Sequence, residues 1–274
     1  MSKNIVNLIV SHKNIITNNI EKKILKLLLL NKSKYFYNKL TKDEIDNIKN
    51  IVGNIKSCVI KLIKNIYIRE NIILNYSNLK KKISHILKDY EKMNILDISQ
   101  KYNNTPLTIM RLILQYSFSK DKVKKIFKNP SLLKSNDFKQ FNNAIQNDYY
   151  TLSTKKQFDD SIEFELKIEK FLKKNNIEYK TQDMLSKEQI KEYGFAFNTP
   201  DFLITSTLYI NNHKINWIDA KNYYGGNSKI IKNNITKQIQ KYIDKYGYGC
   251  IIFGCGYNEN LYFDNVLLLS YDDL

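Results

Sequence analysis

The sequence has few residues of the kinds that build zinc sites or disulfide frameworks. It contains three cysteines and three histidines among 274 residues. Cys58, Cys250 and Cys255 form no CxxC pair, and no histidine lies near another along the chain. We therefore expect neither a Cys/His zinc centre nor a disulfide-stabilised fold, and we predict a reducing compartment.

Long apolar runs are also missing. The strongest cluster, Ile24 to Leu30, is interrupted by Lys26 and preceded by charged residues. A bilayer-spanning helix needs about 20 consecutive apolar residues, so this cluster predicts a buried helix. Residues 1–10 lack the apolar stretch and the cleavage site of a secretory signal. We expect no membrane partner and no secretion, with the protein in the nucleus of a eukaryote or otherwise in the cytoplasm.

Glycine and proline are scarce, at eight and three residues. Before Pro106 they are almost absent, and apolar residues such as Ile20, Ile24 and Leu27 recur at helical spacing. Uninterrupted helices are therefore predicted for the first half of the chain, residues 1–150.

Positive charge is concentrated in that half. Residues 1–150 contain 28 Lys and Arg against 11 Asp and Glu, a net charge of +17, whereas residues 151–274 contain 16 of each. An AT-rich gene explains abundant lysine but not this asymmetry. A basic half-chain attracts polyanions, of which nucleic acid is the usual one, so we expect residues 1–150 to provide most of the binding. An anionic membrane is disfavoured because no Trp-bearing amphipathic terminal helix is present.

The hydrophobic period changes after residue 150. We predict a polar connector over Ser153 to Asp160 and then a small α/β domain over residues 151–274. Its predicted elements are a helix over 162–174, strands over 202–210 and 214–221 joined by a turn at Asn211-Asn212, a helix over 229–246, and strands over 250–253 and 266–269.

A helix-turn-helix pattern is present at about residues 94–116. Asn103 tolerates the left-handed turn that ends the first helix, Thr105 is a good N-cap, and Pro106 suits the first helical position. Ser99 is small where the two helices approach each other. This order of residues is typical of a DNA-binding helix-turn-helix.

The second helix of this pattern offers few polar groups. Thr108, Arg111 and Gln115 share one face and are the candidate nucleic-acid contacts. Apolar residues fill the rest, so the alternative is a helix pair that serves only as core. Lysine–phosphate contacts position DNA without reading its sequence.

Two carboxylates and a lysine are expected to meet in the second half. Asp201 begins one strand of the predicted hairpin, and Asp219 and Lys221 lie on the same face of the other because strand side chains alternate. Oxygen ligands suit Mg²⁺, with Asp201, Asp219 and the Ala220 carbonyl as candidates. Such a centre hydrolyses phosphodiesters, and the lysine offsets the charge of the scissile phosphate.

Two flanking features favour catalysis over a chance match. Glu165 on the preceding helix is a further candidate metal ligand, and Glu163 is the alternative for that position. Gln238 and Tyr242 lie one turn apart on the following helix, where they are candidates to contact substrate and orient the lysine.

The order Glu165, Thr199-Pro200-Asp201, Asp219-Ala220-Lys221 and Gln238-xxx-Tyr242 resembles the TPD-motif branch of the PD-(D/E)xK nucleases. The resemblance covers most of the chain and is weakest over residues 1–40. The human member of that branch, a codanin-interacting nuclease, is similar along the same part of the chain. It has Glu where this chain has Asp219. The resemblance implies a restriction-endonuclease-like C-terminal domain preceded by an all-α domain that contains the helix-turn-helix. It also implies DNA or structured nucleic acid as substrate and Mg²⁺ or Mn²⁺ as cofactor.

Three hypotheses follow. The first is an active nuclease, with a role in repair or on branched DNA. The second is a nucleic-acid-binding protein with an inactive site, against which the intact Asp201, Asp219 and Lys221 argue. The third is an assembly protein whose helical half docks a protein partner.

Overall fold

A computed structural model of the chain describes residues 5–30, 38–53 and 55–274, with the backbone alone for 154–159. The chain divides into two compact units. The first, here the sheet unit, comprises residues 1–24, 52–63 and 157–274. The second, here the helical unit, comprises residues 25–51 and 64–156.

A mixed sheet organises the sheet unit. Among the described residues six strands pair in the order β1-β4-β5-β6-β8, and β3 pairs with β4 beside this path. β4 runs antiparallel to β3 and β5, whereas the pairs β1–β4, β5–β6 and β6–β8 are parallel. The strands are β1 (Ile5–Leu8), β3 (Tyr179–Thr181), β4 (Phe202–Ile210), β5 (His213–Lys221), β6 (Gly249–Phe253) and β8 (Val266–Ser270).

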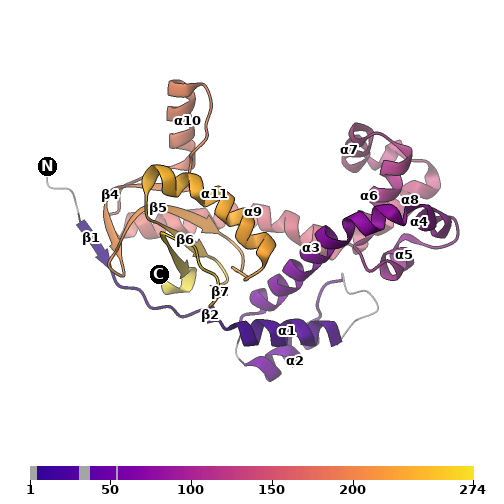
Figure 1. Ribbon diagram of the computed structural model, residues 1–274, viewed down its shortest axis with the longest axis horizontal. Helices are drawn as coiled ribbons and strands as arrows, with labels where there is room; N and C mark the ends of the chain where they lie inside the picture. Colours follow the sequence, from indigo (N-terminus) through magenta and orange to yellow (C-terminus); the bar gives the residue numbers. More distant parts are fainter. Residues whose placement is uncertain (1–4, 31–37, 54) are drawn as a thin grey trace. The chain divides into compact units, whose positions relative to one another are not determined.

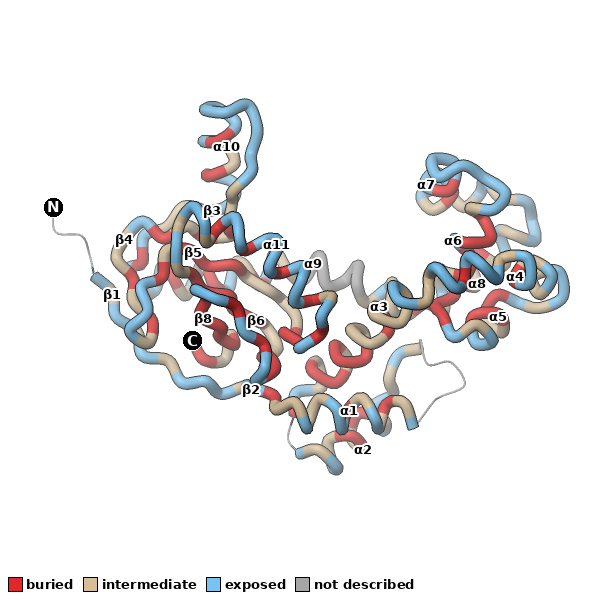
Figure 2. Tube along the Cα trace, in the orientation of Figure 1, coloured by how far each residue is buried: buried red, intermediate tan, exposed pale blue. Residues whose placement is uncertain are grey.

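The predicted strands of the second half are confirmed. The runs 250–253 and 266–269 are almost continuously apolar, as expected for parallel strands buried on both faces. Every residue of β6 and β8 is buried, and Figure 2 shows both strands in red. Asn211 and Asn212 turn the β4–β5 hairpin with φ values of 50° and 65°, a conformation that asparagine tolerates.

Helices cover the two faces of this sheet (Figure 1). The C-terminal part of α9 (Tyr149–Lys174) packs Phe164, Ile168 and Leu172 into the core between α9 and the sheet. On the other face lies α11 (Lys229–Tyr246), where Tyr242 meets Trp217 of β5 edge to face at 5.4 Å between ring centroids. The predicted mixed α/β class is confirmed. The unit also contains α10 (Gln182–Tyr193), η2 (Tyr271–Asp273), and the paired short strands β2 (Ile15–Ile16) and β7 (Tyr257–Asn258).

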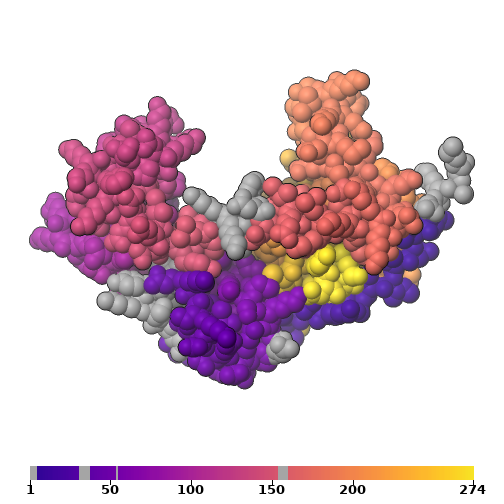
Figure 3. Space-filling view, turned by 180° about the vertical axis from the view of Figure 1, so that it is seen from behind, coloured from indigo at the N-terminus to yellow at the C-terminus, as the bar shows by residue number. Residues whose placement is uncertain are grey.

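The N-terminal residues belong to the sheet, not to the predicted helical domain over 1–150. β1 pairs with β4, and β2 pairs with β7. The backbone N–H of Lys13 donates to Asp273 at 2.6 Å, and Lys56 forms an ion pair with Asp272. Figure 3 shows the yellow C-terminal residues against the indigo N-terminal segment. The four residues of β1 pair with β4, which lies about 200 residues away in the sequence, as Ile5 with Thr207. Hydrophobic periodicity carries no information about such pairing.

The domain boundary that was predicted near residue 150 also differs in the structure, because it is not a connector between two elements. The chain passes from one unit to the other between residues 156 and 157, inside the continuous helix α9. The predicted connector over Ser153 to Asp160 is therefore wrong. Its residues are polar apart from Phe158 and include no glycine or proline, and polar composition alone does not interrupt a helix.

The helical unit is built mainly of short helices around one core. Ile86, Ile98, Met110 and Phe141 are fully buried in it. The unit has 24 Lys and Arg against 10 Asp and Glu, a net charge of +14 of the chain's +17. The helices outside the sheet unit's core are α1 (Asn18–Leu30), α2 (Lys42–Val52), α3 (Ser57–Lys81), α4 (Ile83–Tyr90), α5 (Ile95–Lys101), α6 (Pro106–Ser117), α7 (Lys120–Lys128), η1 (Pro130–Leu132) and α8 (Ser135–Asn147).

The predicted helix pair is present in this unit as α5 and α6. Asn103 has a φ of 47°, and the side chain of Thr105 accepts a hydrogen bond from the Thr108 N–H as the N-cap of α6. Pro106 is the first residue of α6, and the small side chain of Ser99 is buried and donates to the Leu96 carbonyl at 2.7 Å. Within the described ranges no helix combines the length and apolar character that a membrane span requires.

Candidate active site

Hairpin register brings Asp201 to the level of Asp219. Phe202 pairs with Ile218 across antiparallel β4 and β5, so the residue before β4 faces the residue after Ile218. The backbone N–H of Ala220 donates to Oδ2 of Asp201 at 2.6 Å. In a strand the N–H and C=O of one residue point to the same side, so the Ala220 carbonyl is directed toward Asp201 as well.

Asp219 is a fully buried carboxylate. Its Oδ1 accepts from Nε2 of Gln238 at 3.2 Å, and its Oδ2 lies 2.5 Å from Nζ of Lys221 as an ion pair. Among the described residues, Oδ2 nevertheless accepts no hydrogen bond of acceptable geometry. A buried carboxylate oxygen without a donor is costly unless a further positive group approaches it.

Gln238 and Tyr242 complete this cluster from α11. Oε1 of Gln238 accepts from Nζ of Lys221 at 3.0 Å, and its Nε2 lies 3.4 Å from the Tyr242 hydroxyl. That hydroxyl donates to the Thr199 carbonyl at 3.3 Å, which ties α11 to the segment that carries Asp201. The amide of Gln238 therefore orients Lys221, while Tyr242 orients the amide.

The two candidate helix carboxylates occupy different surroundings. Glu163 is exposed and pairs with Lys167 at 2.9 Å along α9. Glu165 is half-buried, and its pKa is raised by burial and by the charge of Asp219, with Asp183 adding to the effect. The structure therefore brings Glu165, and not Glu163, toward the aspartates. Asp183, on the first turn of α10, is a neighbour that sequence reasoning missed.

Negative charge is in excess at this site. Burial, together with the charge of Asp219, raises the pKa of Asp201 to about 7. The Ala220 N–H and Lys221 act in the opposite direction. Burial by itself would lower the pKa of Lys221, but the charge of Asp219 raises it above the ordinary value, so the lysine is fully protonated. The carboxylates are thus arranged to hold positive charge.

The donor set suits a hard divalent cation, although it is small. Across the described residues no group of three or more His, Cys, Asp and Glu side chains is arranged to hold a metal ion. Glu165 therefore does not form a three-carboxylate centre with Asp201 and Asp219. Two carboxylates and a carbonyl are nevertheless a common set for Mg²⁺, which retains several waters, and the buried Oδ2 of Asp219 fits a cation.

Backbone contacts around residue 198 fix the approach to Asp201, and sequence reasoning missed them. Gln189 of α10 is buried, donates to the Asn198 carbonyl at 2.9 Å, and accepts from the N–H groups of Phe197 and Asn198. The Tyr246 hydroxyl donates to the same carbonyl at 3.0 Å. A glutamine whose partners are backbone atoms has no local sequence signal.

The candidate nucleic-acid contacts on α6 are engaged within the helical unit. Oγ1 of Thr108 lies 2.7 Å from Oγ1 of Thr105, and Oε1 of Gln115 accepts from the Tyr76 hydroxyl at 3.0 Å. The exposed Arg111 guanidinium lies over the Phe127 ring at 4.3 Å. Seven residues of α6 are buried, which leaves a narrow exposed strip and favours the core interpretation of this helix over base reading.

Comparison with known proteins places the site within a recognised family model. The model described as "Protein of unknown function TPD sequence-motif" matches residues 134–271, a range that includes every candidate catalytic residue but not α5 and α6. The chain is also 27% identical over 207 residues to "Uncharacterized protein L539" of Acanthamoeba polyphaga mimivirus, which covers 73% of this chain and 72% of the relative. No solved structure matches the chain.

Proposed function

The chain belongs to the TPD sequence-motif family, and we propose that it is a metal-dependent nuclease that hydrolyses phosphodiester bonds of DNA. The observation that carries the proposal is the cluster of Asp201, Asp219 and Lys221, in which Gln238 bridges the lysine and the buried aspartate. The sequence resemblance to PD-(D/E)xK nucleases, with their restriction-endonuclease-like fold, supports the same function.

Asp201, Asp219 and the Ala220 carbonyl would hold the cofactor, Mg²⁺ or Mn²⁺, and Glu165 adds negative charge nearby. When bound, the ion supplies neutralisation of phosphate charge and lowers the pKa of water. The fully buried Asp219 carboxylate, whose Oδ2 has the Lys221 ammonium at 2.5 Å but no well-directed hydrogen bond among the described residues, supports this assignment.

Lys221 stabilises charge at the scissile phosphate. Its ammonium has three N–H donors; one donates to Gln238, and the ammonium also forms an ion pair with Asp219. A remaining donor can interact with a non-bridging phosphate oxygen, on which negative charge increases in the transition state. Gln238 and Tyr242 act as positioning residues that hold the ammonium in one orientation.

Substrate attraction is assigned mainly to the helical unit. Its net charge of +14 far exceeds the +3 of the sheet unit, which has 20 Lys and Arg against 17 Asp and Glu. We expect the bound nucleic acid to be held by phosphate contacts whose affinity falls steeply with salt. The alternative is that the same positive charge serves to dock a protein partner on the helical unit.

The experiment that tests the function is cleavage of labelled DNA and RNA substrates by the full chain. The panel contains single strands, blunt duplexes, overhangs, flaps and junctions, each with Mg²⁺, with Mn²⁺ and with chelator. We expect cleavage of DNA that requires the cation. Salt-dependent binding without cleavage of any substrate would instead support the inactive nucleic-acid-binding hypothesis.

The first prediction concerns Gln238. Its side chain is exposed, so Gln238→Ala should leave the thermal midpoint nearly unchanged. Lys221 loses an acceptor that orients it, and we expect kcat to fall by about tenfold or more with KM little changed. Gln238→Glu retains the acceptor oxygen for Lys221 but replaces the donor to Asp219 with a negative charge, so it should recover kcat only in part. Equal small losses in rate and stability would indicate that Gln238 only packs.

The second prediction concerns pH in the presence of chelator. The folded-state pKa of Asp201 is about 7, above its ordinary value of 3.8, so between these values the folded state binds more protons than the unfolded state. Stability contributed by protonated Asp201 is therefore present at low pH and lost as pH rises through about 7. We expect the thermal midpoint of Asp201→Asn, relative to wild type, to increase over this range.

Added Mg²⁺ should reverse this loss in the wild type, because an ion that binds only the folded state stabilises it. The same addition should leave Asp201→Asn unaffected. A difference between the two proteins that stays constant with pH would contradict the raised pKa of Asp201.

A further inference from the structure

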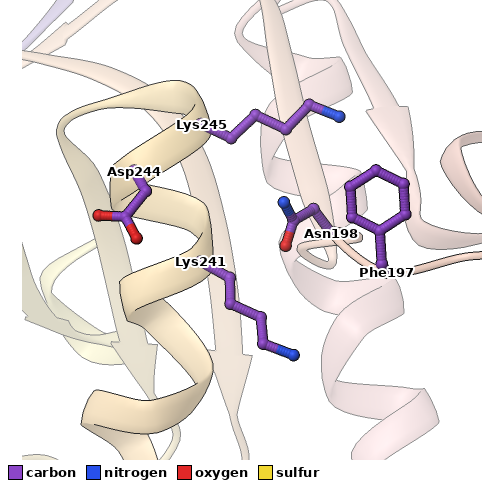
Figure 4. A pocket seen from close by; sticks show the side chains of 5 residues that line it. All are labelled: Phe197, Asn198, Lys241, Asp244 and Lys245. Atoms are coloured by element: carbon purple, nitrogen blue, oxygen red, sulfur yellow. The ribbon is translucent and has the colours of Figure 1, made fainter.

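A pocket of about 410 Å³ lies in the sheet unit beside the candidate active site (Figure 4). Its walls are Phe197 and Asn198, which precede Asp201, and three charged residues of α11, which are Lys241, Asp244 and Lys245. Lys241 follows Gln238 by about one turn of the helix. The pocket therefore adjoins the cluster of catalytic residues but takes no part in the function proposed above.

The open side of this pocket is positively charged. Figure 4 shows the Lys241 and Lys245 side chains extending from α11 toward Phe197 and Asn198, while the carboxylate of Asp244, which also lines the pocket, points away from these two residues. The Asp244 carboxylate accepts from Gln240 at 2.8 Å. Nζ of Lys245 lies 4.9 Å from the centroid of the Phe197 ring. Two exposed ammonium groups on one wall suit a phosphate group.

Exposed aromatic rings continue the opposite wall. Tyr193, Phe195 and Phe197 are 49%, 62% and 39% exposed. Phe197 lies 5.5 Å from Tyr193 and 5.6 Å from Phe195 between ring centroids. A cluster of three exposed aromatic rings is unfavourable in water unless it serves as a binding surface. Aromatic rings beside lysines are the combination that holds unpaired nucleotides, because every base has a π-face that can stack.

Asn198 supplies a polar group between these two walls. Its backbone is held by Gln189 and Tyr246, so its position is fixed. Its side-chain Oδ1 is buried and has no hydrogen-bond partner among the described residues. Leaving such a buried acceptor without a donor is costly, which marks Asn198 as an unusual residue beside the pocket.

We propose that this pocket binds an unpaired nucleotide next to the scissile phosphodiester, with its phosphate at Lys241 and Lys245 and its base on Phe195 and Phe197. The inference rests on the proposed nuclease function and specifies its substrate class. Bases inside a duplex are covered by their neighbours and cannot reach the rings. The preferred substrate therefore contains single-stranded DNA at the cleavage position, as in a single strand, an overhang or a flap.

The test measures binding of the full chain to labelled oligonucleotides by fluorescence anisotropy in chelator, at a salt concentration where a blunt duplex binds weakly. The probes are a single strand, the same strand with abasic sugars, and the blunt duplex. Phe195→Ala should weaken binding of the single strand by about tenfold and leave the abasic strand and the duplex unchanged. The double variant Lys241→Gln, Lys245→Gln should weaken binding of the single strand and of the abasic strand alike.

Matched controls are Tyr262→Ala, which removes a ring that is 63% exposed outside the pocket, and Lys232→Gln, which removes an exposed charge near the start of α11. Neither should alter binding of the single strand. Unchanged binding of the single strand by Phe195→Ala, or an equal loss for all probes, would overturn the proposed pocket.

Cleavage separates failure of the pocket from failure of the nuclease. With Mg²⁺, the wild type should cleave an overhang substrate faster than a blunt duplex, and Phe195→Ala should lose that preference. If the wild type cleaves and Phe195→Ala retains the preference, the pocket proposal fails and the nuclease stands. If Phe195→Ala loses single-strand binding but the wild type cleaves nothing, the nuclease proposal fails and the pocket stands as a binding site.

Discussion

Purified Asp219→Asn is expected to lose cleavage by at least about a hundredfold while retaining its fold. The exchange is nearly isosteric, and the asparagine oxygen still accepts from Gln238 or Lys221. What is lost is the negative charge of a fully buried carboxylate, which is the strongest candidate to hold the cation. Cleavage rate, thermal midpoint and Mn²⁺ binding by calorimetry should be measured on the same preparation, and Mn²⁺ binding should disappear.

Lys221→Met is the companion variant. Methionine keeps an apolar stem of similar length in a side chain that is only 12% exposed, but it has no charge. We expect a similar loss of cleavage with Mn²⁺ binding preserved or strengthened, because the lysine no longer competes for Oδ2 of Asp219. Full cleavage by Asp219→Asn would refute the site. If both variants lose Mn²⁺ binding, Asp219 and Lys221 share a role in holding the ion. In that case no evidence would remain for a separate role of the lysine.

The second large effect is structural and concerns Gly249, the first residue of β6. A Cβ at this position would overlap the indole ring of Trp217, which is fully buried. Trp217 precedes Asp219 by two residues on β5. The indole N–H also donates to the Gly247 carbonyl at 2.9 Å, so the ring cannot move without losing this bond. Overpacking of a filled core costs about 3 kcal/mol at the upper end of its usual range, and we expect Gly249→Ala to lose at least this much.

Urea denaturation of two further variants isolates this cause. Gly194 has a φ of +80° but open space around its Cβ position, so Gly194→Ala should cost only about 1–2 kcal/mol from backbone strain. Trp217→Leu provides room for the new methyl group, so Gly249→Ala should cost much less in that background. Strictly additive losses would mean that the indole ring does not limit position 249.

The segment from residue 202 to residue 246 shows what local sequence can determine. Alternating residues, the Asn211-Asn212 turn and the helical period after Gly226 predicted β4, β5 and α11, because each signal lies within the element that it specifies. The α5–α6 pair was predictable for the same reason, since its turn and cap residues act on the neighbouring backbone. The role of α6 was less predictable, because burial of seven of its residues depends on the helices around it.

The candidate catalytic residues were identified in the sequence by type and order, but their arrangement was not. Fixed strand alternation places Asp219 and Lys221 on one face, and hairpin register brings Asp201 level with them. Selection of Glu165 over Glu163 required the packing of α9 against the sheet, since the two side chains differ only by their rotation about the helix. The link from Gln238 to Lys221 likewise required α11 to lie across β5.

The sequence by itself determined the residue types of the candidate active site, most elements of the second half and the excess of positive charge, because these depend on residue identity and on contacts within a few positions. Only the tertiary structure placed residues 1–24 and 52–63 with the sheet, made α9 continuous, and gathered Phe197, Lys241 and Lys245 around one pocket. Such features depend on contacts between residues far apart in the chain. The free energy of those contacts comes from surfaces that meet only on folding, and no local period in the sequence records which surfaces meet.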